Sequence, residues 1–295
     1  MINPFAKGYD TDTTDAALVE SAQNGDRGAL EKLIVRHQAW IYNIAMRMVL
    51  NPQIAEDVTQ EVLIKVITKL STFQGRSSFR TWLYRIVANH VINMKKQCLE
   101  QVITGFKYYG DELDKAPDMD LPDQNSLPVD AQLIVEEAKI GCMLGMLLCL
   151  DREQRLVYIL GEIFEISDAV GSEIMEISKA NFRQRLSRAR KDMRNFMNEK
   201  CGLLNKNNPC RCAKKTAAWI KAGYVDPYNL LFNANYMKRV KEVSKNKNRE
   251  MCDTLDEQYA ALFKEHPFKN PPDFVKSLQE MLHSQRLRQI LNFDA

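Results

Sequence analysis

The chain has 295 residues, enough for two small domains and an appendage, and 45% of them are hydrophobic, which excludes wholesale disorder. A net charge of only +3 means that the local distribution of charge says more about partners than the total does. Glycine (12) and proline (10) are scarce, which favours helices and predicts an all-α fold. No signal-peptide pattern and no long apolar run is visible, so we expect a cytoplasmic chain without membrane insertion.

Residues 14–98 are expected to form the first helical domain. Asp26 is suited to cap a helix with apolar residues at helical spacing, and Asn51-Pro52 should end that helix. A second helix fits 53–70, and Gln74-Gly75 breaks the chain again. A third helix follows, with one apolar stripe made of Phe79, Trp82, Leu83, Ile86, Val87, His90, Val91 and Met94.

The other side of this third helix has a different composition. Arg80, Tyr84, Arg85 and Asn89 lie opposite the apolar stripe, and an aromatic residue, Phe73, stands just before the helix. Cations beside aromatic rings suit single-stranded DNA, because bases stack on rings while arginines meet phosphates. Phe79 and Trp82, which lie on the stripe itself, are interpreted as core residues.

Residues 99–130 read as an acidic, flexible linker. Three prolines interrupt the segment, and its acidic residues outnumber its cations; they include Asp111, Glu112, Asp114, Asp118, Asp120, Asp123 and Asp130. Such a segment is not expected to pack by itself.

Residues 131–200 are expected to form a second helical domain with a helix-turn-helix. A short helix over 168–175 is followed by a turn near Glu176 and a long basic helix that begins at Ser178. Such a helix can enter a major groove, with amides reading adenine and arginines meeting guanine or phosphate. The residues expected on duplex DNA are Ser178, Lys179, Asn181, Arg183, Gln184, Arg185 and Arg188.

Signatures of enzymes are absent from the sequence. It contains no glycine-rich phosphate loop, no metal-binding helix of the His-Glu type and no nucleophile elbow, and its four histidines are scattered. Carboxylates such as Asp57 and Glu61 lie one helical turn apart, which is typical of a solvated helix face. We therefore expect no catalytic residues.

Two groups of motifs resemble the extracytoplasmic-function (group IV) sigma factors of bacterial RNA polymerase. The runs Ala55–Val62 and Phe73–Asn89 are similar to the second conserved region of that family. The runs Leu150–Arg155 and Arg185–Arg190 are similar to its fourth region. The resemblance covers about 14–200, and a minimal member of the family would end near residue 200.

This resemblance implies partners and site residues. Core RNA polymerase would bind Asp57, Gln60 and Glu61, and the linker would run toward the polymerase active centre. The segment Phe73–Asn89 would melt and capture the −10 promoter element, with one base flipped into a pocket of the protein. The residues implied in this role are Phe73, Ser77, Ser78, Arg80, Tyr84, Arg85 and Asn89. The helix-turn-helix would read the −35 element as a duplex, and an anti-sigma factor is a further expected partner. Gly171 inside the short helix departs from the family pattern.

Residues 201–295 are a C-terminal extension with a cysteine-containing loop and helices expected near 213–222, 226–248, 253–265 and 271–291. Three interpretations of Cys201, Cys210 and Cys212 stay open: a zinc site completed by a fourth ligand, a regulatory disulfide, or no special role. No cofactor is expected beyond that zinc. The extension itself is either a small helical domain with its own core or a built-in regulator that docks on the sigma domains.

Two other functions compete with promoter-specific initiation. A free-standing helix-turn-helix regulator would have to dimerise to span two half-sites, and it leaves the acidic linker and the segment Phe73–Asn89 without a role. A thiol- or metal-responsive sensor that carries a DNA-binding helix is the second alternative, and it predicts bound zinc or DNA affinity that depends on redox state.

Overall fold

A computed structural model describes residues 12–232, 271–276 and 278. These residues contain helices and one isolated bridge but no strand, which confirms the all-α prediction. They divide into two compact units, each built from segments distant in sequence. Of the described residues, the first unit contains 12–96, 156–186, 271–276 and 278, and the second contains 97–155 and 187–232. No helix in the described residues is long and apolar enough to span a membrane.

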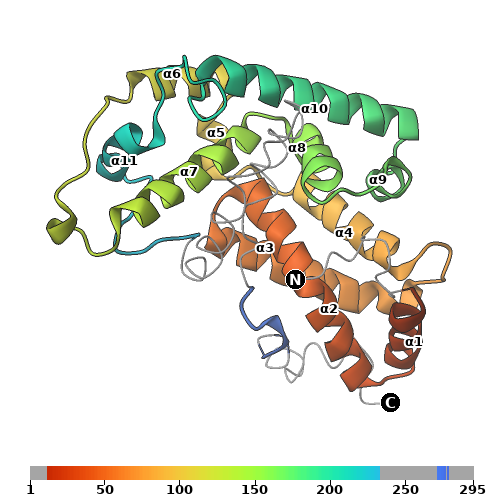
Figure 1. The fold of residues 1–295 in the computed structure, drawn as a ribbon. Coiled ribbons are helices and arrows are strands. Elements are labelled where there is room, and N and C mark those ends of the chain that lie inside the picture. The colour runs from red at the N-terminus through yellow and green to blue at the C-terminus, as the bar shows by residue number, and fades with distance from the viewer. Residues whose placement is uncertain (1–11, 233–270, 277, 279–295) are drawn as a thin grey trace, which may run out of the picture. The chain divides into compact units, whose positions relative to one another are not determined.

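In the first unit, three long helices form the core: α2 (Arg27–Val49), α3 (Pro52–Lys69) and α4 (Phe79–Asn93), with α1 (Asp12–Gln23) packed on α2 (Figure 1). The predicted signals act as expected. The Asp26 carboxylate accepts from the Ala29 amide at the start of α2, and the Asn51 side chain caps α3, whose first residue is Pro52. The short 3-10 helix η1 (Leu70–Thr72) follows α3.

Helix α2 is buried on every side over its second half. Trp40 packs edge-on against Phe164 with 4.5 Å between ring centroids, and Tyr42 lies 6.3 Å from the ring of Phe274. Phe274 and Leu278 of the extension are 4% and 2% exposed. The extension therefore contributes two buried residues to the unit that contains α2. The helices expected over 253–265 and most of 226–248 and 271–291 lie outside the described residues.

The second unit contains α5 (Cys98–Val102), α6 (Phe106–Lys115), the 3-10 helix η2 (Gln124–Ser126), α7 (Ala131–Leu148) and α11 (Cys212–Lys221), with α11 against α7 (Figure 1). The segment 99–130 thus differs from the flexible tether that we expected. Its helix α6 packs because Phe106 and Tyr109 lie against the ring of Phe196, at 5.2 and 5.9 Å. Apolar residues spaced along the acidic segment explain why it folds.

Two helices, α8 (Arg152–Tyr158) and α10 (Lys179–Lys200), each run from one unit into the other. The chain turns into α8 at Asp151, whose side chain accepts from the Gln154 amide at 2.8 Å, as a capping residue should. A π-helical turn (Ile159–Ile163) and α9 (Asp168–Met175) lie between these two helices.

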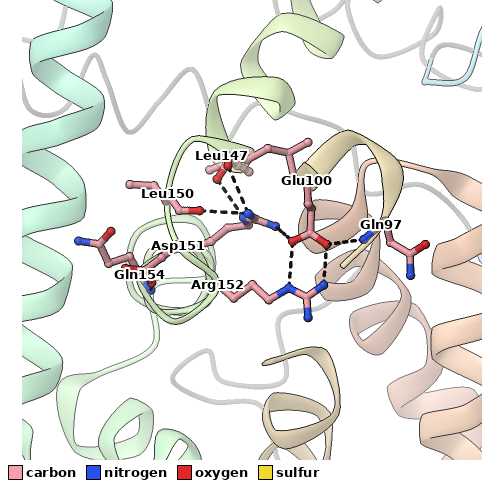
Figure 2. A network of polar contacts seen from close by, with 9 residues as sticks. Gln97, Glu100, Leu147, Leu150, Asp151, Arg152 and Gln154 are labelled. Atoms are coloured by element: carbon pink, nitrogen blue, oxygen red, sulfur yellow. Dashed lines mark hydrogen bonds and ion pairs between the residues drawn. The ribbon is translucent and has the colours of Figure 1, made fainter. Parts of the chain in front are cut away.

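A buried ion network fixes the start of α8 in the second unit (Figure 2). Glu100, 8% exposed, accepts from Arg152 at 2.6 and 2.9 Å and from Arg155 at 2.8 Å. Burial alone would raise the pKa of Glu100, but the hydrogen bonds from Arg152, Arg155 and the Gln97 amide outweigh it and lower the pKa to about 2. Arg155 also donates to the carbonyls of Leu147, Leu148 and Leu150.

We expect Glu100→Gln to lower the free energy of unfolding by about 3 kcal/mol at pH 7, because the pKa of Glu100 falls from 4.5 to about 2 on folding. The ionised carboxylate stabilises the fold fully above pH 4.5, and this stabilisation is lost as the pH falls toward 2. Urea unfolding of both proteins between pH 7 and pH 2 measures the difference, which should shrink with acid. Asp111→Asn, an exposed site in the same unit, is the control.

Candidate nucleic-acid and polymerase interfaces

The helix-turn-helix lies where the sequence predicts it. Ser167 caps α9, Glu176 adopts the left-handed conformation (φ 54°) that makes the turn, and the Ser178 hydroxyl accepts from the Asn181 amide at the start of α10. One face of α10 is buried and carries Phe182, Leu186, Ala189, Met193, Phe196 and Met197. The opposite face is therefore free to meet a ligand.

Most of the residues predicted to contact duplex DNA lie on the accessible side of α10. Exposed members are Ser178, Lys179, Arg183, Gln184 and Arg188. Asn181 and Arg185 are half-buried, and the Arg185 Nε donates to the Asn181 side chain at 3.0 Å. Arg183 forms a 2.7 Å ion pair with Asp168 and keeps 64% of its side chain exposed. A cationic, amide-bearing surface thus runs along the helix.

Two glycines allow α10 to approach the elements before it. A Cβ on Gly171 would lie 2.4 Å from the fully buried ring of Phe182, and a Cβ on Gly161 would lie 2.7 Å from Leu186. Gly171 therefore fits the motif, since only a residue without a side chain leaves room for Phe182. The departure from the family pattern does not disturb the turn, because α9 ends at Met175 and α10 starts at Lys179.

The residues predicted to capture melted DNA all lie on or just before α4, but one of them is buried in the core. Tyr84 is 1% exposed and packs edge-on against His37, so its placement on the DNA-facing side was wrong. It belongs to the core because its position follows directly on Leu83, and the buried arc of α4 is wider than the predicted stripe. Ser78 caps α4 by accepting from the Thr81 amide, and Ser77 lies half-buried next to it.

An aromatic cluster adjoins this segment. The ring of Phe73 lies 5.3 Å from that of Trp82 and 5.8 Å from that of Phe79. Phe79 is buried, as predicted, whereas Trp82, predicted to be a core residue as well, is only half-buried, as is Phe73. Partly accessible aromatic residues in the same segment as Arg80 are the components that stacking on unpaired bases requires.

Arg85 and Asn89 contact α9 within the same unit. Arg85 donates from Nε and Nη2 to the Glu173 carbonyl at 3.2 and 3.0 Å and lies 3.5 Å from the Glu176 carboxylate. Asn89 also donates to Glu176, at 3.5 Å. Two predicted DNA ligands therefore contact the helix-turn-helix itself, and no local sequence pattern indicates this contact.

The three residues predicted to bind polymerase share one side of α3. Asp57 and Glu61 are exposed and Gln60 is half-buried, while Val58, Thr59, Val62 and other neighbours fill the core. Glu61 lies 3.5 Å from the His90 ring, whose pKa is lowered by burial and by Lys65. The side of α3 that carries these three residues is polar and acidic.

The cysteines suggested as metal ligands are brought together in the second unit. Cys201, Cys210 and Cys212 line one small cavity, and Cys142 of α7 lines it with them. Burial raises the pKa of Cys142 above the usual range, that of Cys212 to about 12, and that of Cys210 as well, although Lys215 and Arg211 oppose the shift at Cys210. The nearby cations therefore do not lower the pKa of the Cys210 thiol below its usual value.

The first aromatic residues of the extension do not share one core. Trp219 packs against a cluster of Ile134, Ala138 and Val225, but Tyr224 and Tyr228 are 70% and 82% exposed. Residues 226–232 are turns rather than the start of the predicted helix, and Tyr236 lies outside the described residues.

Comparisons with known proteins agree with the motifs. The family model for sigma-70 region 2 matches residues 33–97. The chain is 42% identical over 83 residues to the RNA polymerase sigma-H factor of Pseudomonas aeruginosa, an alignment that covers 28% of this chain and 43% of that one. It is 29% identical over 187 residues to the ECF RNA polymerase sigma-E factor of Haemophilus influenzae, covering 62% of this chain and 94% of that one. CnrH, in a complex with the cytosolic domain of CnrY, is a similar solved structure with a TM-score of 0.43 and 20% identity, covering 61% of this chain and 94% of that one.

We expect Gly171→Ala to destabilise the helix-turn-helix by about 1–3 kcal/mol, because the added Cβ overlaps the Phe182 ring. Gly141→Ala is the matched control, since its Cβ would meet nothing closer than 4.0 Å and alanine favours a helix. The melting temperature and the affinity for duplex DNA should both fall in Gly171→Ala and stay unchanged in Gly141→Ala. Equal stability of the two variants would contradict the packing role of Gly171.

Proposed function

Because the chain belongs to the sigma factors of the extracytoplasmic-function type, we propose that it binds core RNA polymerase and directs initiation at specific promoters. The observation that carries the proposal is the presence, in one chain, of a region 2 fold and a helix-turn-helix with an exposed basic face on α10. A sigma factor completes the polymerase rather than catalysing a reaction of its own. This role would place the chain in the cytoplasm.

The −35 element is assigned to α10. Exposed Arg183, Gln184 and Arg188 are spaced along one side of the helix, which lets the first two meet base edges while Arg188 meets a phosphate. Lys179, at the helix start, adds a further phosphate contact. The −10 element is assigned to the aromatic cluster and Arg80, where half-buried rings can stack on bases that have left the duplex.

Polymerase binding is assigned to the acidic side of α3. Asp57 and Glu61 are exposed and one turn apart, so they present two carboxylates to the same partner surface. The partner surface should be basic, because exposed charges of opposite sign raise the association rate and set orientation. An anti-sigma factor, if the chain has one, would compete for these same surfaces.

Run-off transcription with purified core polymerase, on a library of upstream regions from the protein's own genome, tests the whole proposal. We expect core-dependent initiation at sites that share two elements. Asp57→Lys should weaken core binding roughly tenfold, because it reverses a charge in the contact face. Asp111→Lys makes the same charge change on α6 and should leave initiation intact. Specific duplex binding without core, and no initiation with it, would instead support a free-standing regulator.

A second prediction concerns the contacts that Arg85 and Asn89 make with Glu176 at the end of α9. Both residues must leave Glu176 before they can contact promoter DNA, so Glu176→Gln should raise the affinity of the free chain for a single-stranded −10 oligonucleotide. Exposed ion pairs contribute little, so about a two- to fivefold gain is expected. Glu173→Gln on the same helix is the control, because Arg85 contacts only the carbonyl of Glu173. Equal affinities for the two variants would show that the Glu176 contact does not limit binding.

A further inference from the structure

Four thiols line a single cavity in the second unit. Cys142 comes from the middle of α7, Cys201 follows the end of α10, Cys210 lies in the loop, and Cys212 opens α11. The cavity has a volume of about 20 Å³, which is room for about one water molecule or one ion. Two parts of the chain that are far apart in sequence, α7 and residues 201–212, therefore place cysteines around one small space.

The loop that carries these cysteines is shaped to bring them together. The backbones of Cys201 and Cys210 pair in an isolated β-bridge. A Cβ on Gly202 would lie 2.1 Å from the Cys210 carbonyl oxygen, so only glycine permits this approach. The Asn208 side chain donates to the Asn198 and Cys201 carbonyls, which holds the loop against the end of α10.

Cations surround the thiols. Lys139 lines the same cavity, and Lys215 and Arg211 lie close enough to Cys210 to influence its charge. Four thiolates around a divalent ion carry a net charge of −2, which buried apolar surroundings alone would disfavour. Nearby ammonium and guanidinium groups offset that charge, so the surroundings suit a metal–thiolate centre.

We propose that Cys142, Cys201, Cys210 and Cys212 bind one structural Zn²⁺ ion. Four sulfur ligands at the corners of a tetrahedron are the usual donor set for structural zinc, and a cavity for one ion is too small for an iron–sulfur cluster. On binding, four thiols lose four protons to solvent and four Zn–S bonds form, with no change in oxidation state. The closed ligand set leaves no position for a substrate.

The four sulfur atoms must move to complete the site. As they lie, no three His, Cys, Asp or Glu residues of the described segments converge tightly enough to hold a metal. A cysteine side chain has one rotatable bond, so rotation about χ1 moves each sulfur without moving the backbone. The site would then join α7, the end of α10 and α11, and part of the stability of the second unit would depend on the metal.

The test uses the full chain, purified without chelators. Elemental analysis should find about one zinc per chain in the wild type, and Cys142→Ser should lower that stoichiometry severalfold. Cys149→Ser is the matched control, because Cys149 is on the same stretch of chain but does not line the cavity. A strong chelator should lower the Tm of the wild type and of Cys149→Ser. Replacement of the metal by Co²⁺ should give the visible absorption of a tetrahedral thiolate site.

One measurement needs no variant and remains valid if Cys142→Ser does not fold. Alkylation of the native chain, mapped by mass spectrometry, should spare the four cavity cysteines until the chelator is added. A chain without zinc, whose four thiols alkylate equally with and without chelator, would overturn the proposal. A metal-free chain lighter by two hydrogen atoms, with Cys201 linked to Cys210, would also overturn it and assign a redox pair instead.

Discussion

The buried guanidinium of Arg155 connects α5, α7 and α8 of the second unit through hydrogen bonds. A helix leaves its last four carbonyl groups without partners inside the helix, and α7 ends in apolar surroundings where water cannot satisfy them. Arg155 donates to three carbonyls at that end, those of Leu147, Leu148 and Leu150. Its charge is in turn compensated by Glu100 of α5. The same network therefore caps α7, fixes the start of α8 and folds the first part of the acidic segment onto them.

The position of α8 matters because the helix-turn-helix continues directly from it. After the π-helical turn, α9 and α10 pack through two contacts that exclude side chains, those at Gly161 and Gly171. Tight packing of this kind leaves α10 little freedom to rotate about its axis, since Phe182 fits only one side of α9. Gly161 and Gly171 lack a Cβ and let one side of α10 pack closely. Arg183 and Gln184 therefore face solvent.

The sequence predicted the elements whose signals are local. The cap at Asp26, the helix stop at Asn51-Pro52, the start of the basic helix near Ser178 and the periodicity of α2 and α4 depend on residues a few positions apart. The bounds of these helices were therefore accessible from the sequence. Tyr84 was misplaced because the width of a buried arc depends on what packs against the helix, here His37. The folding of 99–130 was missed because its partners, Phe196 among them, lie far along the chain. Composition records charge but not which distant side chains neutralise it.

Much of that neutralisation comes from the extension. Asp114 pairs with Lys200 at 2.6 Å, Asp118 with Lys215 at 3.1 Å, and Asp120 with Lys214. These carboxylates contact cations on and just before the extension. Each pair is weak by itself, but three pairs in parallel favour the folded segment. The acidic segment and the basic start of the extension therefore act as one electrostatic unit, which explains why a chain longer than the minimal family member folds its linker.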